Sequence, residues 1–178
     1  MDIILIRHTK VAAKEGICYG HTDIELAPSF EKEKKSIQKK LAHNKFNVVY
    51  SSPLSRCKKL AQAIFPGLEI IYDERLKELN FGNWEGLNWD EISSSEEAKA
   101  FFEDYINTTC PEGESYQDML KRVSSFYEEI KVKHKDSQVA IVSHGGPIRA
   151  FLCIIEGISP KDAFERKVDY GEVIKTRT

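Results

Sequence analysis

Histidine and arginine side chains recur just after short apolar runs of this sequence. Four of them follow three such runs: Arg7 and His8 the first, Arg56 the second, and His144 the third. A neutral imidazole nitrogen is a nucleophile, and the planar guanidinium fork of arginine fits phosphate oxygens. An Arg-His pair directly after an apolar run has no packing rationale, because burial of a charge is costly. These residue types together predict a pocket for a phosphate ester.

The apolar runs have the pattern of strands that are buried on both faces. They cover Ile3–Ile6, Val48–Tyr50 and Val139–Val142. Helix-like sequence follows the second and third runs, at Pro53–Phe65 and Pro147–Glu156. This alternation predicts an α/β sandwich with a mostly parallel sheet, in which ligands bind outside the carboxyl ends of the strands. The arginines and histidines are therefore expected to meet at one edge of the sheet.

Other segments are expected to complete and cover this sheet. Amphipathic spacing predicts helices over Phe30–His43, Ser93–Asn107 and Ser115–His134. Weaker strand signals lie at Leu68–Tyr72 and Glu172–Ile174, the second as an edge strand.

Composition narrows the classes of protein. The chain has 178 residues, of which 41% are apolar and 30% charged, so we expect one compact domain over residues 1–178. Its formal charge of -2 gives no broad attraction to nucleic acid or to an anionic membrane. Apolar runs stop after five residues, which predicts neither a signal peptide nor a membrane span and favours the cytoplasm. The 4 cysteines form no C-x-x-C pair and are expected to be free thiols.

Four separated blocks carry a resemblance to a known family. They are Ile4–Thr9, Ser51–Arg56, Glu78–Gly86 and Val142–Gly146. They resemble, in the same order, the signature blocks of the histidine phosphatase superfamily, which has the phosphoglycerate-mutase-like fold. The resemblance implies a three-layer α/β/α sandwich in which one histidine is transiently phosphorylated.

The resemblance also implies a role for each matching residue. His8 matches the nucleophile of the family, and Arg7, Arg56 and His144 match its phosphate-binding ring. Glu78 matches the usual proton donor, and one carboxyl group can protonate the leaving alkoxide and later deprotonate the water. Fixed cations do the charge work in this scheme, so it needs neither a metal ion nor another cofactor.

The loop after the first strand favours one branch of this family. Thr9-Lys10 follows the Arg-His pair where common members have Gly-Glu, and the loop Gly16–Leu26 is similar to that of α-ribazole phosphatase. Such enzymes remove the 5′-phosphate of α-ribazole 5′-phosphate in cobalamin assembly. Tyr19, His21 and Asp23 of this loop are expected near the leaving group, although a simple packed turn is the alternative. Gly145, with its neighbour Gly146, is expected to bring backbone N–H groups to the phosphate.

Several alternatives remain open at this point. The substrate is a small phosphate monoester, and a sugar phosphate or a broad range of esters fits the same residues. A phosphoglycerate mutase is less favoured, because segments that cover the site of a mutase are not evident. A module that binds a phosphorylated ligand without turnover is disfavoured, because all five catalytic candidates are present. The oligomeric state is left open. Trp84 and Trp89 are expected in the core rather than against a substrate.

Overall fold

One five-stranded sheet runs through the computed structural model, which describes residues 1–177. The strands, in chain order, are β1 (Asp2–Arg7), β2 (Val48–Ser51), β3 (Ile70–Tyr72), β4 (Gln138–Ser143) and β5 (Val173–Arg177). Their order across the sheet is β3-β2-β4-β1-β5. The first four run parallel, whereas β5 pairs antiparallel with β1 at the edge. The predicted mostly parallel sheet and the edge strand near the C-terminus are confirmed.

The helices of the described residues connect these strands. They are α1 (Phe30–Leu41), α2 (Ser55–Ile64), α3 (Trp89–Ile92), α4 (Glu96–Glu103), α5 (Tyr116–Lys133), α6 (Gly145–Glu156) and α7 (Pro160–Glu165). Short 3₁₀ turns lie at Glu74–Leu76 and Gly82–Trp84. None of the helices within residues 1–177 is both long and apolar enough to cross a membrane.

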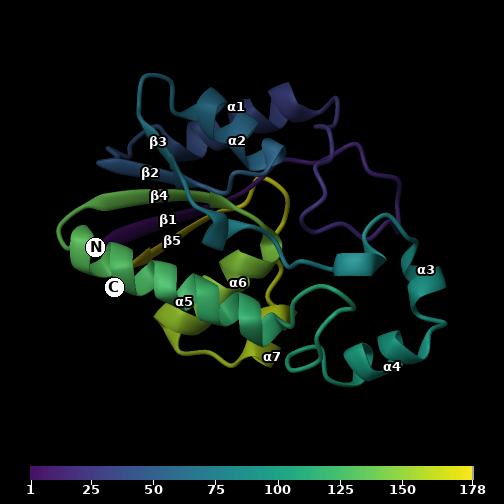
Figure 1. The fold of residues 1–178 in the computed structure, drawn as a ribbon. Coiled ribbons are helices and arrows are strands. Elements are labelled where there is room, and N and C mark those ends of the chain that lie inside the picture. Colours follow the sequence, from purple (N-terminus) through teal and green to yellow (C-terminus); the bar gives the residue numbers. More distant parts are fainter. Residues whose placement is uncertain (178) are drawn as a thin grey trace.

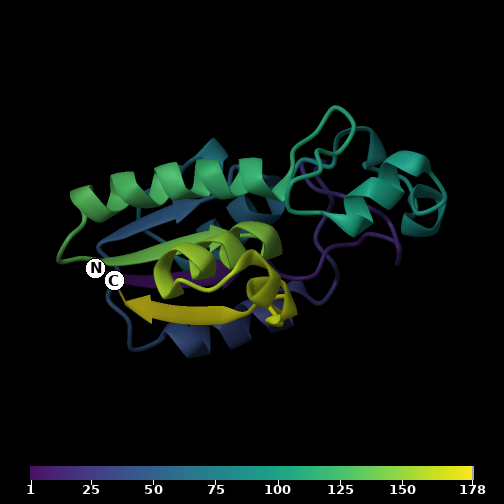
Figure 2. The ribbon, with the colours of Figure 1, turned by 90° about the horizontal axis from the view of Figure 1, so that it is seen from below.

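Alternating side chains of the buried strands form two hydrophobic clusters, one on each face of the sheet. Ile4 and Ile6 of β1 join the cluster of α1 and α2, whereas Ile3 and Leu5 join that of α5 and α6. All four are at most 2% exposed. Figures 1 and 2 show the result: α1 and α2 cover one face, and α5, α6 and α7 cover the other. The three-layer α/β/α arrangement follows from this two-sided burial.

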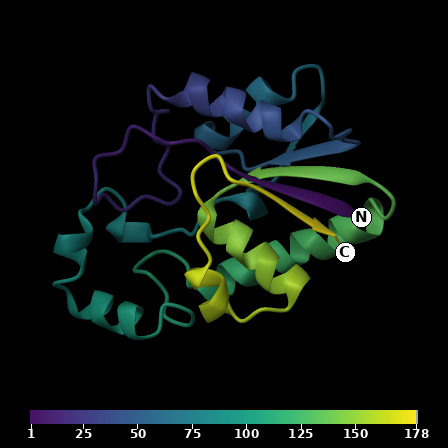
Figure 3. The same cartoon turned by 180° about the vertical axis from the view of Figure 1, so that it is seen from behind.

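The two ends of the strands carry different features. The start of β1 and the end of β5 lie side by side at one end of the strands, because β5 runs back along β1 (Figure 3). At the other end of the strands, α3, α4 and their loops extend beyond the carboxyl ends of the parallel strands (Figure 1). The sequence predicts the site at these carboxyl ends.

The structure shifts some predicted boundaries. The helix expected over Ser93–Asn107 ends at Glu103, because the Asp104 carboxylate accepts hydrogen bonds from the backbone and side chain of Asn107 and closes a turn. The helix expected from Pro147 begins at Gly145, since proline is tolerated in a first turn, where its missing N–H has no partner to lose. Helix α7, which begins at Pro160 after the N-cap Ser159, was not predicted.

Trp84 is buried at 5% exposure, and Trp89 is partly buried against the same cluster, so both tryptophans pack as expected. The 4 cysteines are free thiols, and Cys18 is fully buried as a small core side chain.

Candidate active site

The register of the three central strands brings the predicted residues together. Arg7 at the end of β1 lies opposite Ser143 at the end of β4. Beyond the strands, the His8 N–H donates to the Ser143 carbonyl at 3.0 Å, and the Ser52 N–H donates to the Val142 carbonyl at 2.9 Å. These bonds continue the ladder by one residue, so the segments that carry His8, Ser52 and His144 leave the sheet side by side.

His8 is held in the form that a nucleophile needs. Its side chain is 1% exposed, and Nδ1–H donates to the Thr9 carbonyl at 2.7 Å. Since a carbonyl only accepts, the proton of the neutral ring is on Nδ1 and the lone pair is on Nε2. Burial, then the charges of Arg56 and Arg7, hold the pKa of His8 well below its ordinary value. The ring is therefore neutral at physiological pH.

Arg56 is fully buried in the first turn of α2 and is tied down from three directions. Nε donates to Nδ1 of His144 at 3.2 Å, Nη1 to the Thr22 carbonyl at 2.9 Å, and Nη2 to the Gly20 carbonyl at 2.6 Å. One hydrogen of each terminal nitrogen is left without a partner in these contacts. Gly20 fits because a Cβ there would lie 1.8 Å from the Leu79 carbonyl oxygen, so only glycine allows this approach.

His144 has protein partners on both ring nitrogens. Nδ1 accepts from Arg56, which places the proton on Nε2, and Nε2–H donates to the Ser52 hydroxyl at 2.8 Å. Burial first, then Arg56, His8 and Arg7, keep the pKa of His144 well below its ordinary value. In this arrangement His144 orients Arg56, and its ring stands edge-on to His8 with centroids 5.1 Å apart.

Arg7 is positioned by one aromatic ring and one carbonyl. Nη1 donates to the Val168 carbonyl at 2.6 Å, and Cζ lies 4.0 Å above the ring of Tyr170. The hydroxyls of Tyr170 and Tyr19 share a hydrogen bond of 2.7 Å, which joins the C-terminal segment to the loop after β1. Burial and this bond raise the pKa of Tyr19, so its hydroxyl stays protonated. Sequence reasoning missed Tyr170, because no motif surrounds it.

The carboxylate of Glu78 lies at the N-terminus of α6. It accepts the N–H of Gly146 at 3.1 Å and of Leu79 at 3.0 Å. A Cβ on Gly146 would lie 2.2 Å from Oε1 of Glu78, so a side chain at that position would displace the carboxylate. The N–H of Gly146, expected to face the phosphate, thus holds the candidate acid and base.

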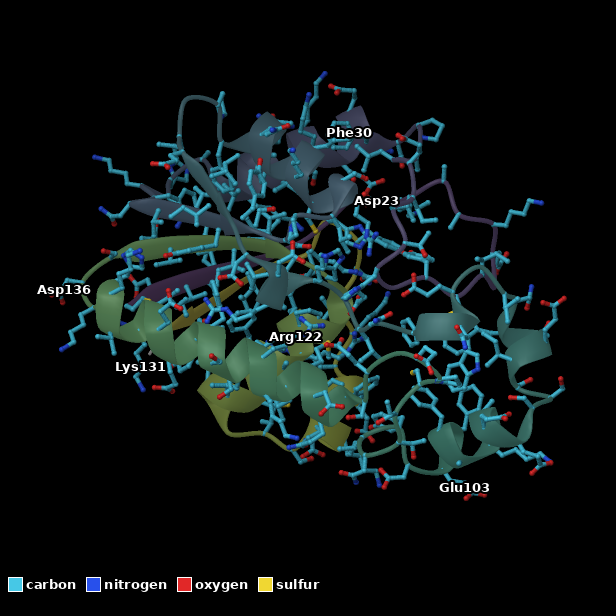
Figure 4. The ribbon with its side chains drawn as sticks, viewed as in Figure 1. Asp23, Phe30, Glu103, Arg122, Lys131 and Asp136 are labelled. Carbon is cyan, nitrogen blue, oxygen red and sulfur yellow. The ribbon has the colours of Figure 1, made fainter. Side chains whose placement is uncertain are left out.

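The backbone of Glu78 is fixed by two further side chains. Its carbonyl accepts from Nε2 of His21 at 2.9 Å and from Nη2 of Arg122 at 2.8 Å. Arg122 lies on α5 (Figure 4) and pairs with Glu114 at 2.8 Å. His21, expected to contact the substrate, therefore supports Glu78 instead. Sequence analysis gave Arg122 no role, because one arginine on an amphipathic helix carries no signal.

Asp23, the remaining loop residue of interest, lies beside the start of α2 (Figure 4). Its carboxylate accepts the Ser55 N–H at 2.7 Å. Helix α2 has no side-chain cap from its own N-cap residue, so Asp23 supplies the anion that its first turn needs. This contact anchors the loop next to Arg56.

A cavity of about 210 Å³ opens among these groups. Its polar and charged lining comprises Arg7, His8, Tyr19, Glu78, Tyr116 and Arg149, and Gly145 and Gly146 contribute backbone. Arg56 and His144 are fully buried beside His8. Arg149, which lies on α6, belongs to no motif of the sequence. Within residues 1–177 no cluster of three or more His, Cys, Asp or Glu side chains is arranged to hold a metal ion.

The architecture and the sequence both match known proteins. A crystal structure of α-ribazole phosphatase from Shigella flexneri superposes with a TM-score of 0.91 over 98% of this chain and 89% of that one, at 23% identity. Phosphoserine phosphatase 1 of Hydrogenobacter thermophilus is 30% identical over 163 residues, which cover 89% of this chain and 77% of that protein. The 2,3-bisphosphoglycerate-dependent phosphoglycerate mutase of Brucella melitensis biotype 2 is 29% identical over 95% of this chain and 88% of its own. The model of the histidine phosphatase superfamily (branch 1) matches residues 3–178, and the chain belongs to this superfamily.

Proposed function

We propose that this protein hydrolyses small phosphate monoesters through a phosphohistidine at His8. The observation that carries the proposal is the state of His8: a buried, neutral ring whose Nδ1–H is bound to the Thr9 carbonyl, so that Nε2 keeps its lone pair. Arg7 and Arg56 supply positive charge beside it. The proposal includes a single domain over residues 1–178 and a cytoplasmic location.

In the first step, Nε2 of His8 attacks phosphorus, the N–P bond forms, and the ester P–O bond breaks. The leaving oxygen takes a proton from the carboxyl group of Glu78, which lines the same cavity. The free N–H groups of Arg7 and Arg56 stabilise the charge on the three equatorial oxygens. His144 keeps Arg56 oriented for this task.

In the second step, a water molecule attacks the phosphohistidine. The Glu78 carboxylate takes a proton from this water, and the N–P bond breaks. Inorganic phosphate leaves, and the electron pair of the broken bond stays on Nε2 of His8. Glu78 thus returns to its protonated form, and the cycle balances in protons.

The substrate that we propose first is α-ribazole 5′-phosphate, as a step of cobalamin assembly. The support is the likeness of the loop Gly16–Leu26 and the position of Tyr19 in the cavity wall. Aromatic side chains at this place suit a leaving group that carries a heteroaromatic base.

A second candidate class is the small phosphorylated carboxylic acids, such as phosphoserine and phosphoglycerate. The cavity of about 210 Å³ is smaller than the roughly 300–1,000 Å³ of usual ligand sites, which favours a small ester. Relatives at 29% and 30% identity carry names with such substrates. Within this class we propose hydrolysis rather than phosphoryl exchange.

The test of the function is a pulse with a ³²P-labelled ester followed by a rapid quench. We expect acid-labile, base-stable label on the protein and release of labelled phosphate during a chase. His8→Ala should remove both signals, whereas His43→Ala, which changes an exposed histidine, should keep them. Substantial turnover by His8→Ala would refute the proposal, and tight phosphate binding without turnover by the wild type would favour a binding module.

A further inference from the structure

Arg149 is a cation of the cavity that the proposed reaction does not use. It lies on α6, one turn after Gly145, and its side chain lines the cavity together with His8 and Glu78. Among the ion pairs of the described residues, none involves Arg149 or Arg7. The cavity therefore holds unpaired guanidinium groups before any ligand binds.

The guanidinium of Arg149 is held in place but is not satisfied. Cζ lies 5.5 Å above the ring of Phe164, and Nη1 donates to the Gly145 carbonyl at 3.2 Å. Nε of Arg149 is buried without a hydrogen-bond partner, and so is Nε of Arg7. A buried donor without an acceptor is costly, so both guanidinium groups keep unmet hydrogen-bonding capacity beside the cavity.

Arg149 and Arg7 converge on one point of the cavity wall. A Cβ on Gly145 would lie 3.1 Å from Nη1 of Arg149 and 3.5 Å from Cζ of Arg7. Burial first, and then the charge of Arg7, lower the pKa of Arg149, while Glu78 acts in the opposite sense. Two like charges on either side of one point of the wall are stabilised by an anion between or beside them.

In the proposed reaction, the positive charge of Arg149 has no negative partner. A phosphate monoester dianion is matched by Arg7 and Arg56, and Glu78 must be protonated, hence neutral, to donate its proton. With both histidines neutral, one positive charge remains on Arg149. A second negative group on the substrate would neutralise this charge.

We propose that Arg149 binds a carboxylate of the substrate. It thereby selects small phosphate esters whose carbon chain also carries a carboxylate. This proposal rests on the proposed function and favours its second candidate class, the small phosphorylated carboxylic acids, over α-ribazole 5′-phosphate. A carboxylate suits the place because it is planar and accepts two parallel hydrogen bonds from a guanidinium.

The test uses two esters that differ only in the carboxylate: O-phosphoserine and O-phosphoethanolamine. The wild type should hydrolyse O-phosphoserine with a kcat/KM at least about tenfold higher, which is the size expected for a charge-assisted hydrogen bond. Arg149→Ala should reduce this ratio toward one and leave the kcat/KM of O-phosphoethanolamine within a few-fold of the wild type. Arg149→Lys should keep part of the preference, because it retains the charge but not the planar fork.

Arg166→Ala is the matched control. Arg166 is a half-exposed arginine that pairs with Glu156 at 2.7 Å and does not line the cavity, so its loss should leave the ratio unchanged. Thermal unfolding of each variant shows whether it is folded. α-Ribazole 5′-phosphate, which has no carboxylate, serves as a third ester whose turnover should not depend on Arg149.

The outcomes separate the two proposals. Equal kcat/KM for the two esters in a wild type that forms labelled phospho-His8 would overturn the role of Arg149 and leave the proposed function standing. A ratio that survives Arg149→Ala would do the same. Absence of hydrolysis of every ester by the wild type would overturn both.

Discussion

Nε of Arg56 donates a hydrogen bond to Nδ1 of His144 at 3.2 Å, and this contact joins two residues that are 88 positions apart in the chain. Because it occupies Nδ1, it forces the ring proton onto Nε2, where Ser52 accepts it. Arg56 and His144, which match phosphate-binding residues of the family, therefore form a unit in which the histidine orients the arginine. The unit is fully buried, so its hydrogen bonds are not shared with water.

His144→Ala should impair the reaction through Arg56. The buried Nε of Arg56 would lose its acceptor, at a cost of about 1–3 kcal/mol of stability, and its terminal nitrogens would lose their fixed direction. We expect kcat/KM to fall by about 100-fold or more, while His8 still accepts label slowly. Ser52→Ala removes only the acceptor of Nε2–H and should have a smaller effect. A wild-type rate for His144→Ala in a rapid-quench assay would contradict the coupling.

Gly146→Ala should act on the acid and base, because the new Cβ would lie 2.2 Å from Oε1 of Glu78 and would displace it. The loss should be large for an alkyl phosphate, whose leaving oxygen needs a proton, and small for p-nitrophenyl phosphate, whose leaving group does not. Glu78→Gln should show the same difference between the two esters. Both are measured as the rate of phosphoenzyme formation, and an equal loss for both esters would argue against Glu78 as the donor.

The pH dependence of kcat/KM should lack the acidic limb of an ordinary histidine. Burial and the charges of Arg56 and Arg7 hold the pKa of His8 well below 6.5, so the free enzyme keeps its neutral nucleophile at that pH. With p-nitrophenyl phosphate, whose leaving group needs no proton from Glu78, and after correction for the second ionisation of the substrate phosphate, we expect the profile to stay level through pH 6.5. A fall in kcat/KM with a midpoint near 6.5 that remains after this correction would contradict a depressed pKa at His8.

Stability should decrease on acidification below pH 6.5. The pKa values of His8 and His144 are lowered in the folded state, so below 6.5 the unfolded chain binds protons that the folded protein does not. The stability from keeping these rings neutral is complete above 6.5 and is lost as pH falls toward the folded-state values. Each group contributes a slope of about 1.4 kcal/mol per pH unit in that window.

Denaturant unfolding at several pH values measures this effect, and His8→Asn should reduce the slope because one titrating ring is gone. His43→Asn, which changes an exposed histidine, is the matched control and should leave the slope as it is in the wild type. A free energy of unfolding that is flat from pH 7 to 5, after allowance for the carboxylates, would show that the rings titrate normally.

The amino-acid pattern is enough to predict the sheet and the residues that follow its strands. Runs such as Ile3–Ile6 are apolar without interruption, and burial on two faces is the arrangement in which such a run is stable. His8 and His144 follow their strands directly in the chain, so parallel pairing of those strands is enough to bring them together. Local covalent order and hydrophobic burial decide these features, and both are written in the sequence.

The contacts of each side chain depend instead on how the folded elements pack. Arg7 meets Val168 across 161 residues, and Arg122 meets Glu78 across 44 residues, and no local pattern encodes such pairs. His21 supports Glu78 rather than lining the cavity, and Arg149 enters the cavity from the second turn of α6. The physical reason is that a polar side chain takes whichever partner the packed helices and loops bring within hydrogen-bond reach, and that geometry exists only after the chain has folded.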